Sequence, residues 1–447
     1  MPPALPDRAD TIYAPSSGFG RAAVAVVRIS GPAAGDALDA LTGPRPAPRT
    51  LSLRRLRDPA SGVLLDRALV AWLPGPGTAT GEDMVELHLH GGLAVRMAVL
   101  RALATVPGCR PAEAGAFTRR AFLHGRIDLT EAEGIADLID AETEAQRLQA
   151  LRQLDGVLGQ QVAAWRAVAI DLLASAEAAL DFADEGDVDA DGLDAAQAGR
   201  AGALSTEIRS VLADGRRGER LREGFVVVLA GPPNAGKSTL LNALAGRDAA
   251  IVSDRPGTTR DAIEVRCDLG GLPVVLVDTA GLRETADPVE AEGVARTRRR
   301  IETADLVLRL APMGDPLPEE GHQTAFLRVR TKSDLSEGEG REDGERDSVA
   351  ISARTGAGLD ALLAAIRRKA EAALGGGDAL VTRERHRTAL TRAAAHLDRV
   401  SGALPGFPPE LIAEDLRLAV RALGEVGGHV GVEEMLDRLF AGFCIGK

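Results

Sequence analysis

The stretch GPPNAGKST, from Gly231 to Thr239, decides the fold of the central part of this 447-residue chain. It follows the apolar run VVVLA and precedes the helix-like run LLNALAG, so a buried strand, a tight loop and a helix are expected in that order. Gly231 to Ser238 fit the pattern G-x-x-x-x-G-K-[ST], whose backbone N–H groups cradle phosphate while the lysine, here Lys237, reaches the outer phosphates. The sequence therefore predicts an α/β domain that binds a nucleoside triphosphate, with Mg²⁺ on the Ser238 hydroxyl.

Two further segments carry groups for the Mg²⁺ ion and the γ-phosphate. VVLVDTAG, from Val274 to Gly281, is an apolar strand that ends in Asp278. The Asp278 carboxylate can hold the Mg²⁺ shell through water, while the Gly281 N–H can contact the γ-phosphate. PGTTRD, from Pro256 to Asp261, supplies the hydroxyl of Thr259 as a Mg²⁺ ligand.

Two segments near the end of the α/β region indicate guanine as the base. In TKSD, Thr331 to Asp334, the carboxylate of Asp334 can accept hydrogen bonds from guanine N1–H and its 2-amino group, which adenine lacks. The backbone of SARTGAG, Ser352 to Gly358, can meet the guanine O6. These segments, in this order, predict a GTPase. Thr331 stands where such motifs usually carry Asn, so we expect GTP preference to be kept and affinity to be weakened. The residues expected to contact GTP are Asn234, Ala235, Gly236, Lys237, Ser238, Thr239, Ser253, Asp254, Arg255, Pro256, Gly257, Thr258, Thr259, Asp278, Thr279, Ala280, Gly281, Thr331, Lys332, Asp334, Ser352, Ala353 and Arg354.

Asn234 is one of only two asparagines in the chain, and it lies inside the phosphate loop. GTP hydrolysis needs one group that stabilises transition-state charge and another that orients water. Leu282, not a glutamine, follows Gly281, and the sequence identifies no arginine finger. The amide oxygen of Asn234 can hold a monovalent cation in place of the finger; alternatively, Asn234 only stabilises the tight loop. The scarcity of Asn favours the cation. Water orientation would then fall to a carboxylate that follows, with these candidates: Glu284, Asp287, Glu290 and Glu292.

The composition limits the classes of partner and compartment. A net charge of −12 disfavours strong non-specific nucleic-acid binding but leaves room for RNA on a local basic surface. The three cysteines have no metal-binding or CxxC spacing, which favours a reducing compartment. With no apolar signal core and no 18-residue apolar run, we expect a soluble cytoplasmic protein without membrane attachment. Only four of the 53 basic residues are lysines, among them Lys237, Lys332 and Lys447, which makes these candidate functional sites.

Changes in periodicity divide the chain into three domains. Short β-like runs with one helical run predict an N-terminal α+β domain over residues 1–120. Apolar residues three and four apart predict a helical bundle over 121–222, and helical spacing returns over 376–447. Alternating strands and helices predict an α/β domain over 223–375. The expected fold is a multidomain α+β protein whose P-loop GTPase domain is inserted into the helical domain.

Several motifs extend beyond the nucleotide segments. They are DTIYAPSSGFGRAAVAVVRISG (Asp10–Gly31), GEDMVELHLHGG (Gly81–Gly92), FTRRAFLHGRIDLTEAEGIADLIDAET (Phe117–Thr143), DTAGLRET, and FCIGK (Phe443–Lys447) at the C-terminus. With these motifs the chain resembles, over nearly its full length, the MnmE (TrmE) family of bacterial tRNA uridine-34 modification GTPases, of the TrmE-Era-EngA-like class. FCIGK at the very end of a chain of this length is highly specific.

The resemblance implies a folate site and ion sites. In the family, the N-terminal domain binds a 5-formyl- or 5,10-methylene-tetrahydrofolate at positions that map onto Arg28, Glu86, Arg126 and Lys447, with Arg126 in place of the usual Lys. K⁺ maps onto Asn234, Ser253, Arg255 and Thr258, and Mg²⁺ onto Ser238 and Thr259. The water-orienting carboxylate of the family maps onto Glu290.

The resemblance also implies partners and a reaction. The family is a homodimer through its N-terminal domain, and it works with the FAD-containing protein MnmG (GidA). Together they install an aminomethyl- or carboxymethylaminomethyl-type group on C5 of the wobble uridine of certain tRNAs. Cys444 is either a nucleophile in this reaction or a small buried residue that packs the chain end. A different class, a GTP-dependent binding switch without modification chemistry, would carry the same nucleotide motifs, but the N-terminal segments and FCIGK favour the enzyme.

Overall fold

The computed structural model describes residues 10–18, 20–181, 195–214, 216–247, 249–251, 264–278, 304–316, 325–335, 348–375, 379–403, 408–430, 433–443 and 446. The contacts divide the chain into two compact units. Unit 1 comprises Met1–Ala136 and Gly427–Lys447, and unit 2 comprises Asp137–Val426. The predicted division into three domains, at residues 120, 222 and 375, stays a prediction.

Unit 1 is built on a six-stranded sheet with the order β3-β4-β5-β2-β1-β6. One face of this sheet packs Val27, Ile29 and Leu87 against α1 and α2 in a dry core, because alternate residues of a strand point to the same side. The remaining helices of unit 1 form a second small core around Leu129 and Phe440. The strands are β1 (Thr11–Pro15), β2 (Val24–Ser30), β3 (Leu51–Arg57), β4 (Leu64–Leu73), β5 (Met84–His90) and β6 (Cys109–Pro111). The helices are α1 (Ala34–Thr42), α2 (Leu93–Ala104), α3 (Ala116–Leu123), α4 (Leu129–Asp140, which ends in unit 2) and α14 (Glu433–Ala441).

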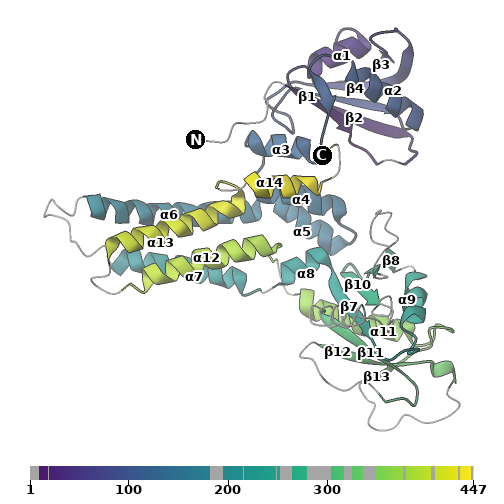
Figure 1. Ribbon diagram of the computed structural model, residues 1–447, viewed down its shortest axis with the longest axis vertical. Coiled ribbons are helices and arrows are strands. Elements are labelled where there is room, and N and C mark those ends of the chain that lie inside the picture. The colour runs from purple at the N-terminus through teal and green to yellow at the C-terminus, as the bar shows by residue number, and fades with distance from the viewer. Residues whose placement is uncertain are drawn as a thin grey trace, which may run out of the picture. The chain divides into compact units, whose positions relative to one another are not determined.

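The helical part of unit 2 closes around one aliphatic core. Trp165 of α6, Leu204 of α7, Leu390 of α12 and Leu416 of α13 all belong to it, and Figure 1 shows these four helices side by side. The predicted packing of the C-terminal helices against the preceding bundle is therefore confirmed for α12 and α13. The helices of this part are α5 (Glu144–Leu154), α6 (Val157–Asp181), α7 (Ala195–Leu212), α8 (Arg217–Glu223), α12 (Glu384–Ser401) and α13 (Pro409–Gly427). Among the described residues, no helix has both the length and the apolar character needed to cross a bilayer.

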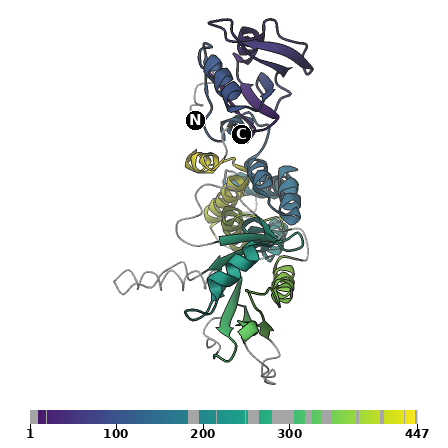
Figure 2. The ribbon, with the colours of Figure 1, turned by 90° about the vertical axis from the view of Figure 1, so that its right-hand side faces the viewer.

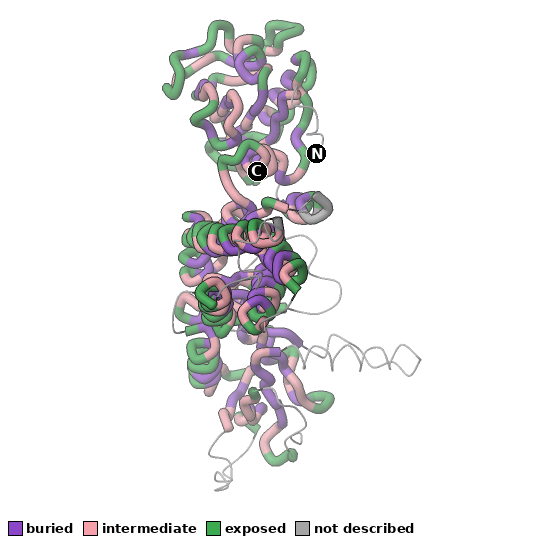
Figure 3. Tube along the Cα trace, turned by 90° about the vertical axis from the view of Figure 1, so that its left-hand side faces the viewer, coloured by how far each residue is buried: buried purple, intermediate pink, exposed green. Residues whose placement is uncertain are grey.

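The α/β part of unit 2 is a seven-stranded sheet with the order β13-β12-β11-β7-β10-β9-β8. Five neighbouring strands run parallel and β9 runs antiparallel to β10. Helices α9 and α11 share one core with a single face of this sheet, and Figure 2 shows α9 along the strands. All six residues of β10 are buried, and Figure 3 shows buried residues in purple along the tube. The strands are β7 (Phe225–Ala230), β8 (Ala250–Ile251), β9 (Glu264–Asp268), β10 (Pro273–Asp278), β11 (Leu306–Pro312), β12 (Phe326–Thr331) and β13 (Ser348–Ala350), and the helices are α9 (Lys237–Ala245) and α11 (Leu359–Leu374). This is the predicted inserted α/β GTPase fold, and the parallel strands end at one edge, where ligands bind in such sheets.

Candidate functional site

The phosphate loop connects β7 to α9 at this edge of the sheet. Asn234, with φ 62°, and Gly236, with φ 90°, have left-handed backbone conformations that turn the chain into the start of α9. The first backbone N–H groups of a helix have no intrahelical partner and favour an anion such as phosphate. The ammonium of Lys237 donates to the carbonyl oxygens of Gly231, at 2.8 Å, and Pro232, at 3.0 Å. The loop therefore has the conformation expected of a phosphate cradle, with the lysine amine held against it.

The structure is compatible with both interpretations of Asn234, as a cation ligand and as a residue that stabilises the loop. Its left-handed backbone suits Asn better than most non-glycine residues, which is a reason for Asn that needs no cation. The side chain is exposed, and within the described residues no hydrogen bond joins its amide to the loop. The amide oxygen can therefore still coordinate a cation.

Ser238 and Asp278 meet where α9 begins and β10 ends. The Ser238 hydroxyl donates to Asp278 Oδ2 at 2.7 Å, and Asp278 is 1% exposed. β10 pairs with β7 in parallel, with Val277 opposite Val228, so its end arrives beside the phosphate loop. Hydroxyl and carboxylate oxygens are the hard donors that Mg²⁺ prefers. These two residues therefore fit a Mg²⁺ ion bound by Ser238, with Asp278 in its shell.

The predicted guanine segments also come together. Asp334 lies in the 3₁₀ turn after β12, and the hydrogen bond from Ser352 is the main cause that lowers the pKa of its carboxyl, followed by its own backbone N–H and the nearby Arg354. The carboxylate is thus an ionised acceptor. Lys332 has a left-handed φ of 57°, and the hydroxyl of Thr331 bonds to the phosphate loop at the carbonyl oxygen of Ala235.

Several of the predicted site residues lie outside the described residues. They are Ser253, Asp254, Arg255, Pro256, Gly257, Thr258, Thr259, Thr279, Ala280, Gly281, Glu290, Cys444 and Lys447. Their assignments stay predictions.

Two of the four predicted folate residues form a pair on the sheet of unit 1. Arg28 of β2 lies directly opposite Glu86 of β5, and its guanidinium donates two hydrogen bonds to Glu86 Oε1, at 2.9 and 3.2 Å. The Arg28 guanidinium also lies 6.0 Å from the ring centre of Phe117. The ion pair is only part-buried, so both charges can be reached from solvent. Arg126 packs its aliphatic stem near the Gly81 turn instead.

The end of the chain is attached to the same sheet. The hydroxyl of Ser16 donates to the carbonyl oxygen of Gly446 at 2.9 Å. Gly446 has φ 97°, and a Cβ there would stand 1.8 Å from the carbonyl oxygen of Pro15. Only glycine fits at this point.

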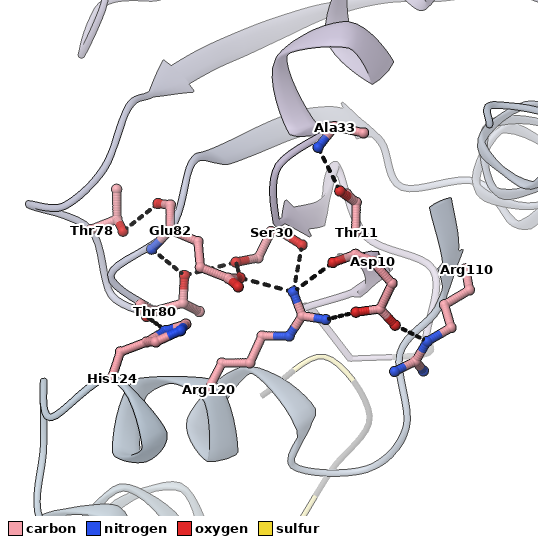
Figure 4. A network of polar contacts seen from close by, with 10 residues as sticks. All are labelled: Asp10, Thr11, Ser30, Ala33, Thr78, Thr80, Glu82, Arg110, Arg120 and His124. Carbon is pink, nitrogen blue, oxygen red and sulfur yellow. Dashed lines mark hydrogen bonds and ion pairs between the residues drawn. The ribbon is translucent and has the colours of Figure 1, made fainter. Parts of the chain in front are cut away.

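A polar network in unit 1 joins α3 to the sheet (Figure 4). The guanidinium of Arg120 donates to Asp10 Oδ1 at 2.6 Å, to Glu82 Oε2 at 2.9 Å, and to the carbonyl oxygens of Asp10 and Ser30 at 3.1 Å. His124 Nδ1 donates to the carbonyl oxygen of Thr80 at 2.7 Å. A cavity of about 600 Å³ borders the network and also reaches α14.

The sequence reasoning missed this network. Asp10 and Arg120 both lie in the quoted motifs but received no role there. The doubled arginine in FTRRAF, at Arg119 and Arg120, was the available signal.

Comparisons with known proteins cover the whole chain. Residues 129–444 match the family described as "MnmE helical domain", and residues 11–126 match "GTP-binding protein TrmE N-terminus". The protein named tRNA modification GTPase MnmE from Methylorubrum populi is 79% identical over the full length of both chains. The protein of the same name from Methylobacterium radiotolerans is 70% identical over 98% of this chain and 99% of its own.

Among solved structures, the G domain of the T. maritima FeoB iron transporter is 27% identical over 32% of this chain and 98% of its own, with a TM-score of 0.25. Era, in complex with MgGDPNP and a segment of 16S ribosomal RNA, is 23% identical over 41% of this chain and 68% of its own, with a TM-score of 0.26.

Proposed function

Because the chain belongs to the MnmE (TrmE) family of tRNA modification GTPases, we propose that its GTP hydrolysis is stimulated by K⁺ and drives modification of the wobble uridine, U34, at C5. The group installed is of the aminomethyl or carboxymethylaminomethyl type. A tetrahydrofolate, 5-formyl or 5,10-methylene, supplies one carbon, and the FAD-containing MnmG (GidA) is the partner. The protein acts as a homodimer in the cytoplasm.

One observation carries this proposal: a single chain holds both the phosphate loop, with Asn234 exposed on it, and the reachable Arg28–Glu86 pair. A purely GTP-dependent switch needs the first feature but not the second. A cationic and an anionic group side by side suit the pterin ring of a folate, whose carbonyl oxygen can accept from a guanidinium and whose neighbouring N–H groups can donate to a carboxylate.

The cation part of the proposal assigns K⁺ to Asn234 with Ser253, Arg255 and Thr258. Mg²⁺ is assigned to Ser238 and Thr259, and water orientation to Glu290. Among the residues that the structure describes, the exposed side chain of Asn234 and the hydrogen bond from Ser238 to Asp278 support these assignments. A bound cation supplies positive charge where an arginine finger otherwise would.

The test of the cation is GTP turnover at matched ionic strength in KCl and in NaCl. An arginine finger is worth roughly 10³–10⁵ in rate, and a cation substitute should recover a measurable part of it. We expect strong stimulation by K⁺ in the wild type and none in Asn234→Ala. Asn242→Ala, which changes the other asparagine, is the matched control. Equal wild-type rates in the two salts would mean that Asn234 only stabilises the phosphate loop.

The test of the modification chemistry is reconstitution with FAD-loaded MnmG, GTP, 5,10-methylene-tetrahydrofolate and tRNA lacking the U34 modification. Ammonium or glycine is added to supply the nitrogen of the aminomethyl or carboxymethylaminomethyl group. Mass spectrometry of the nucleosides is expected to show a C5-modified uridine only when both proteins and the folate are present. Modification without folate would remove the carbon-donor assignment. No product in the complete mixture, from a chain that hydrolyses GTP, would favour the binding switch.

We assign Cys444 as a nucleophile in this reaction. A Cys444→Ser protein that keeps full modification activity would instead make it a packing residue. Its GTP turnover, measured in parallel, separates a chemical defect from misfolding.

A further inference from the structure

The segments through which the chain enters and leaves the α/β part are fixed to the helices by α5. The side-chain amide of Gln146 donates to the carbonyl oxygen of Arg222 at 3.0 Å, and that of Gln149 to the carbonyl oxygen of Gly218 at 3.1 Å. Both carbonyls belong to α8, which leads into β7. Gln153, on the next turn of α5, accepts from the hydroxyl of Thr382 at 2.7 Å. These hydrogen bonds therefore fix α8 and the segment around Thr382 to the helical part. Figure 1 shows α8 where the helices meet the sheet.

The sheet touches α5 at a second place, the turn between β9 and β10. The backbone N–H of Ala145, in the first turn of α5, donates to the carbonyl oxygen of Gly271 at 3.1 Å. The start of a helix leaves such N–H groups without an intrahelical partner, so the turn supplies one of the caps of α5. Beside it, Arg266 of β9 forms an ion pair with Glu142 at 3.3 Å.

This turn joins the two strands that lead to the nucleotide. β10 ends at Asp278, which is bonded to Ser238 at the phosphate loop. β9 follows directly the segment that contains Thr259. The two strands are paired along their length, with Arg266 opposite Val275, so a shift of one end of this hairpin carries the other end with it.

The contact is built so that it can open. It borders a polar cleft of about 240 Å³, lined by residues that include Asp140, Arg222 and Arg266. The Arg266–Glu142 pair is part-exposed, and ion pairs that water reaches hold their partners only weakly. Water therefore already reaches the polar groups beside this contact.

We propose that the β9–β10 turn is the contact through which the nucleotide state of the α/β part is passed to α5. The turn holds the start of α5 in one nucleotide state and releases it in the other. Because such coupling is reciprocal, fixing the contact must change the relative affinities for the two nucleotides by the same factor.

A reversible disulfide tests this directly. A Cβ added at Gly271 would lie 3.9 Å from the Cβ of Glu144, within the range of about 3.5–4.5 Å that disulfides require. The double variant Glu144→Cys with Gly271→Cys can thus be locked by oxidation and released by a reductant. The strain of a side chain at Gly271, which has φ 89°, is present in both forms and cancels. Each single-cysteine variant, oxidised in the same way, controls for the native cysteines.

The measurement is the ratio of the dissociation constants for fluorescent GDP and a fluorescent, non-hydrolysable GTP analogue, in KCl with Mg²⁺. We expect the locked protein to differ from its own reduced form by about 5-fold or more in this ratio, with no difference in the single variants. An unchanged ratio in a protein shown to be locked would overturn the proposal.

If the disulfide does not form, charge reversal decides. Arg266→Glu and Glu142→Arg should each shift the ratio, and the double reversal should bring it back toward wild type. Folded single reversals with the wild-type ratio would equally overturn the proposal.

Discussion

The hydroxyl of Thr331 donates a 2.7 Å hydrogen bond to the carbonyl oxygen of Ala235. Both residues are buried, Thr331 at the end of β12 and Ala235 in the phosphate loop. The bond ties the segment that leads to Asp334 to the loop that leads to Lys237. An Asn amide at position 331 also carries an N–H that can donate to this carbonyl. The replacement of Asn by Thr therefore keeps a donor here, while the expected weakening of GTP affinity stays a prediction.

Thr331→Val should weaken GTP binding. Valine keeps the shape but removes the donor, leaving a buried carbonyl without this partner, which costs about 1 kcal/mol or more and corresponds to about 5-fold in affinity. Thr331→Ser should bind like the wild type. Titration with a fluorescent GTP analogue measures the effect. Thr206→Val is the control, because Thr206 is exposed on α7 and its hydroxyl donates to the carbonyl oxygen of Gly202 in the same helix. Equal affinities for the Val and Ser variants would mean that the hydrogen bond from Thr331 to Ala235 does not affect GTP binding.

Asp278→Asn should raise the Mg²⁺ concentration needed for GTP hydrolysis. An amide keeps the size but removes the negative charge beside Ser238, and losing several kcal/mol of charge stabilisation slows turnover about 10²-fold or more. A Mg²⁺ titration of turnover measures this. The control is Asp360→Asn, whose carboxylate is exposed on α11. An unchanged Mg²⁺ requirement would remove Asp278 from the metal shell.

Arg28→Gln and Glu86→Gln should each weaken folate binding. Hydrogen bonds to charged groups contribute about 1.5–3 kcal/mol, which corresponds to about 10-fold or more in affinity. Calorimetric titration with 5-formyl-tetrahydrofolate measures it on the full chain. Arg45→Gln removes a comparable ion pair with Asp39 elsewhere in unit 1 and should change nothing. Wild-type affinity in both variants would place the folate elsewhere.

The sequence predicted what is local and missed what is distant. The phosphate loop, the end of β10 and the helical periods are each encoded within a few neighbouring residues, so pattern and spacing were sufficient. The ties that fix the sites join residues far apart: Thr331 and Ala235 are 96 positions apart, Arg120 and Asp10 are 110, and Ser16 and Gly446 are 430. Whether such groups meet depends on packing, which no short pattern records. For the same reason α14 was expected with the helical domain, although its contacts lie in unit 1.

Cys267 should make the chain lose stability in alkali. Burial within β9 raises the pKa of its thiol from the ordinary value of 9.0 to about 11. The folded state therefore keeps the proton while the unfolded state loses it, so this contribution is fully present below pH 9 and is lost as pH rises toward 11. Urea unfolding of wild type and of Cys267→Ala between pH 8 and pH 11 measures it. This window runs from below the ordinary thiol pKa of 9.0 to the raised pKa of about 11. The free-energy difference between the two proteins should shrink across this window; a constant difference would contradict the buried thiol.

Two arginines that bind the same carboxylate should differ sharply in what they contribute to stability. Arg120, with a side chain 14% exposed, bridges Asp10 and Glu82, whereas Arg110 is 47% exposed and pairs with Asp10 alone. Removing Arg120 leaves the part-buried Glu82 without this cation and leaves Asp10 with Arg110 alone. Breaking such a pair costs about 3–5 kcal/mol when it is fully buried. Removing Arg110 breaks a surface pair worth about 0–1 kcal/mol.

We therefore expect Arg120→Met to lower the free energy of unfolding of unit 1 by about 2 kcal/mol or more, discounted for its partial exposure, and Arg110→Met to change it by less than about 1 kcal/mol. Urea unfolding followed by the fluorescence of Trp72, which lies in the core of unit 1, reports on this unit. Trp165, in the helical core of unit 2, is replaced by Phe in both variants and in the reference so that the signal comes from one place. If the two arginine variants unfold at the same urea concentration, the network of Figure 4 is a surface feature and does not fix α3 to the sheet.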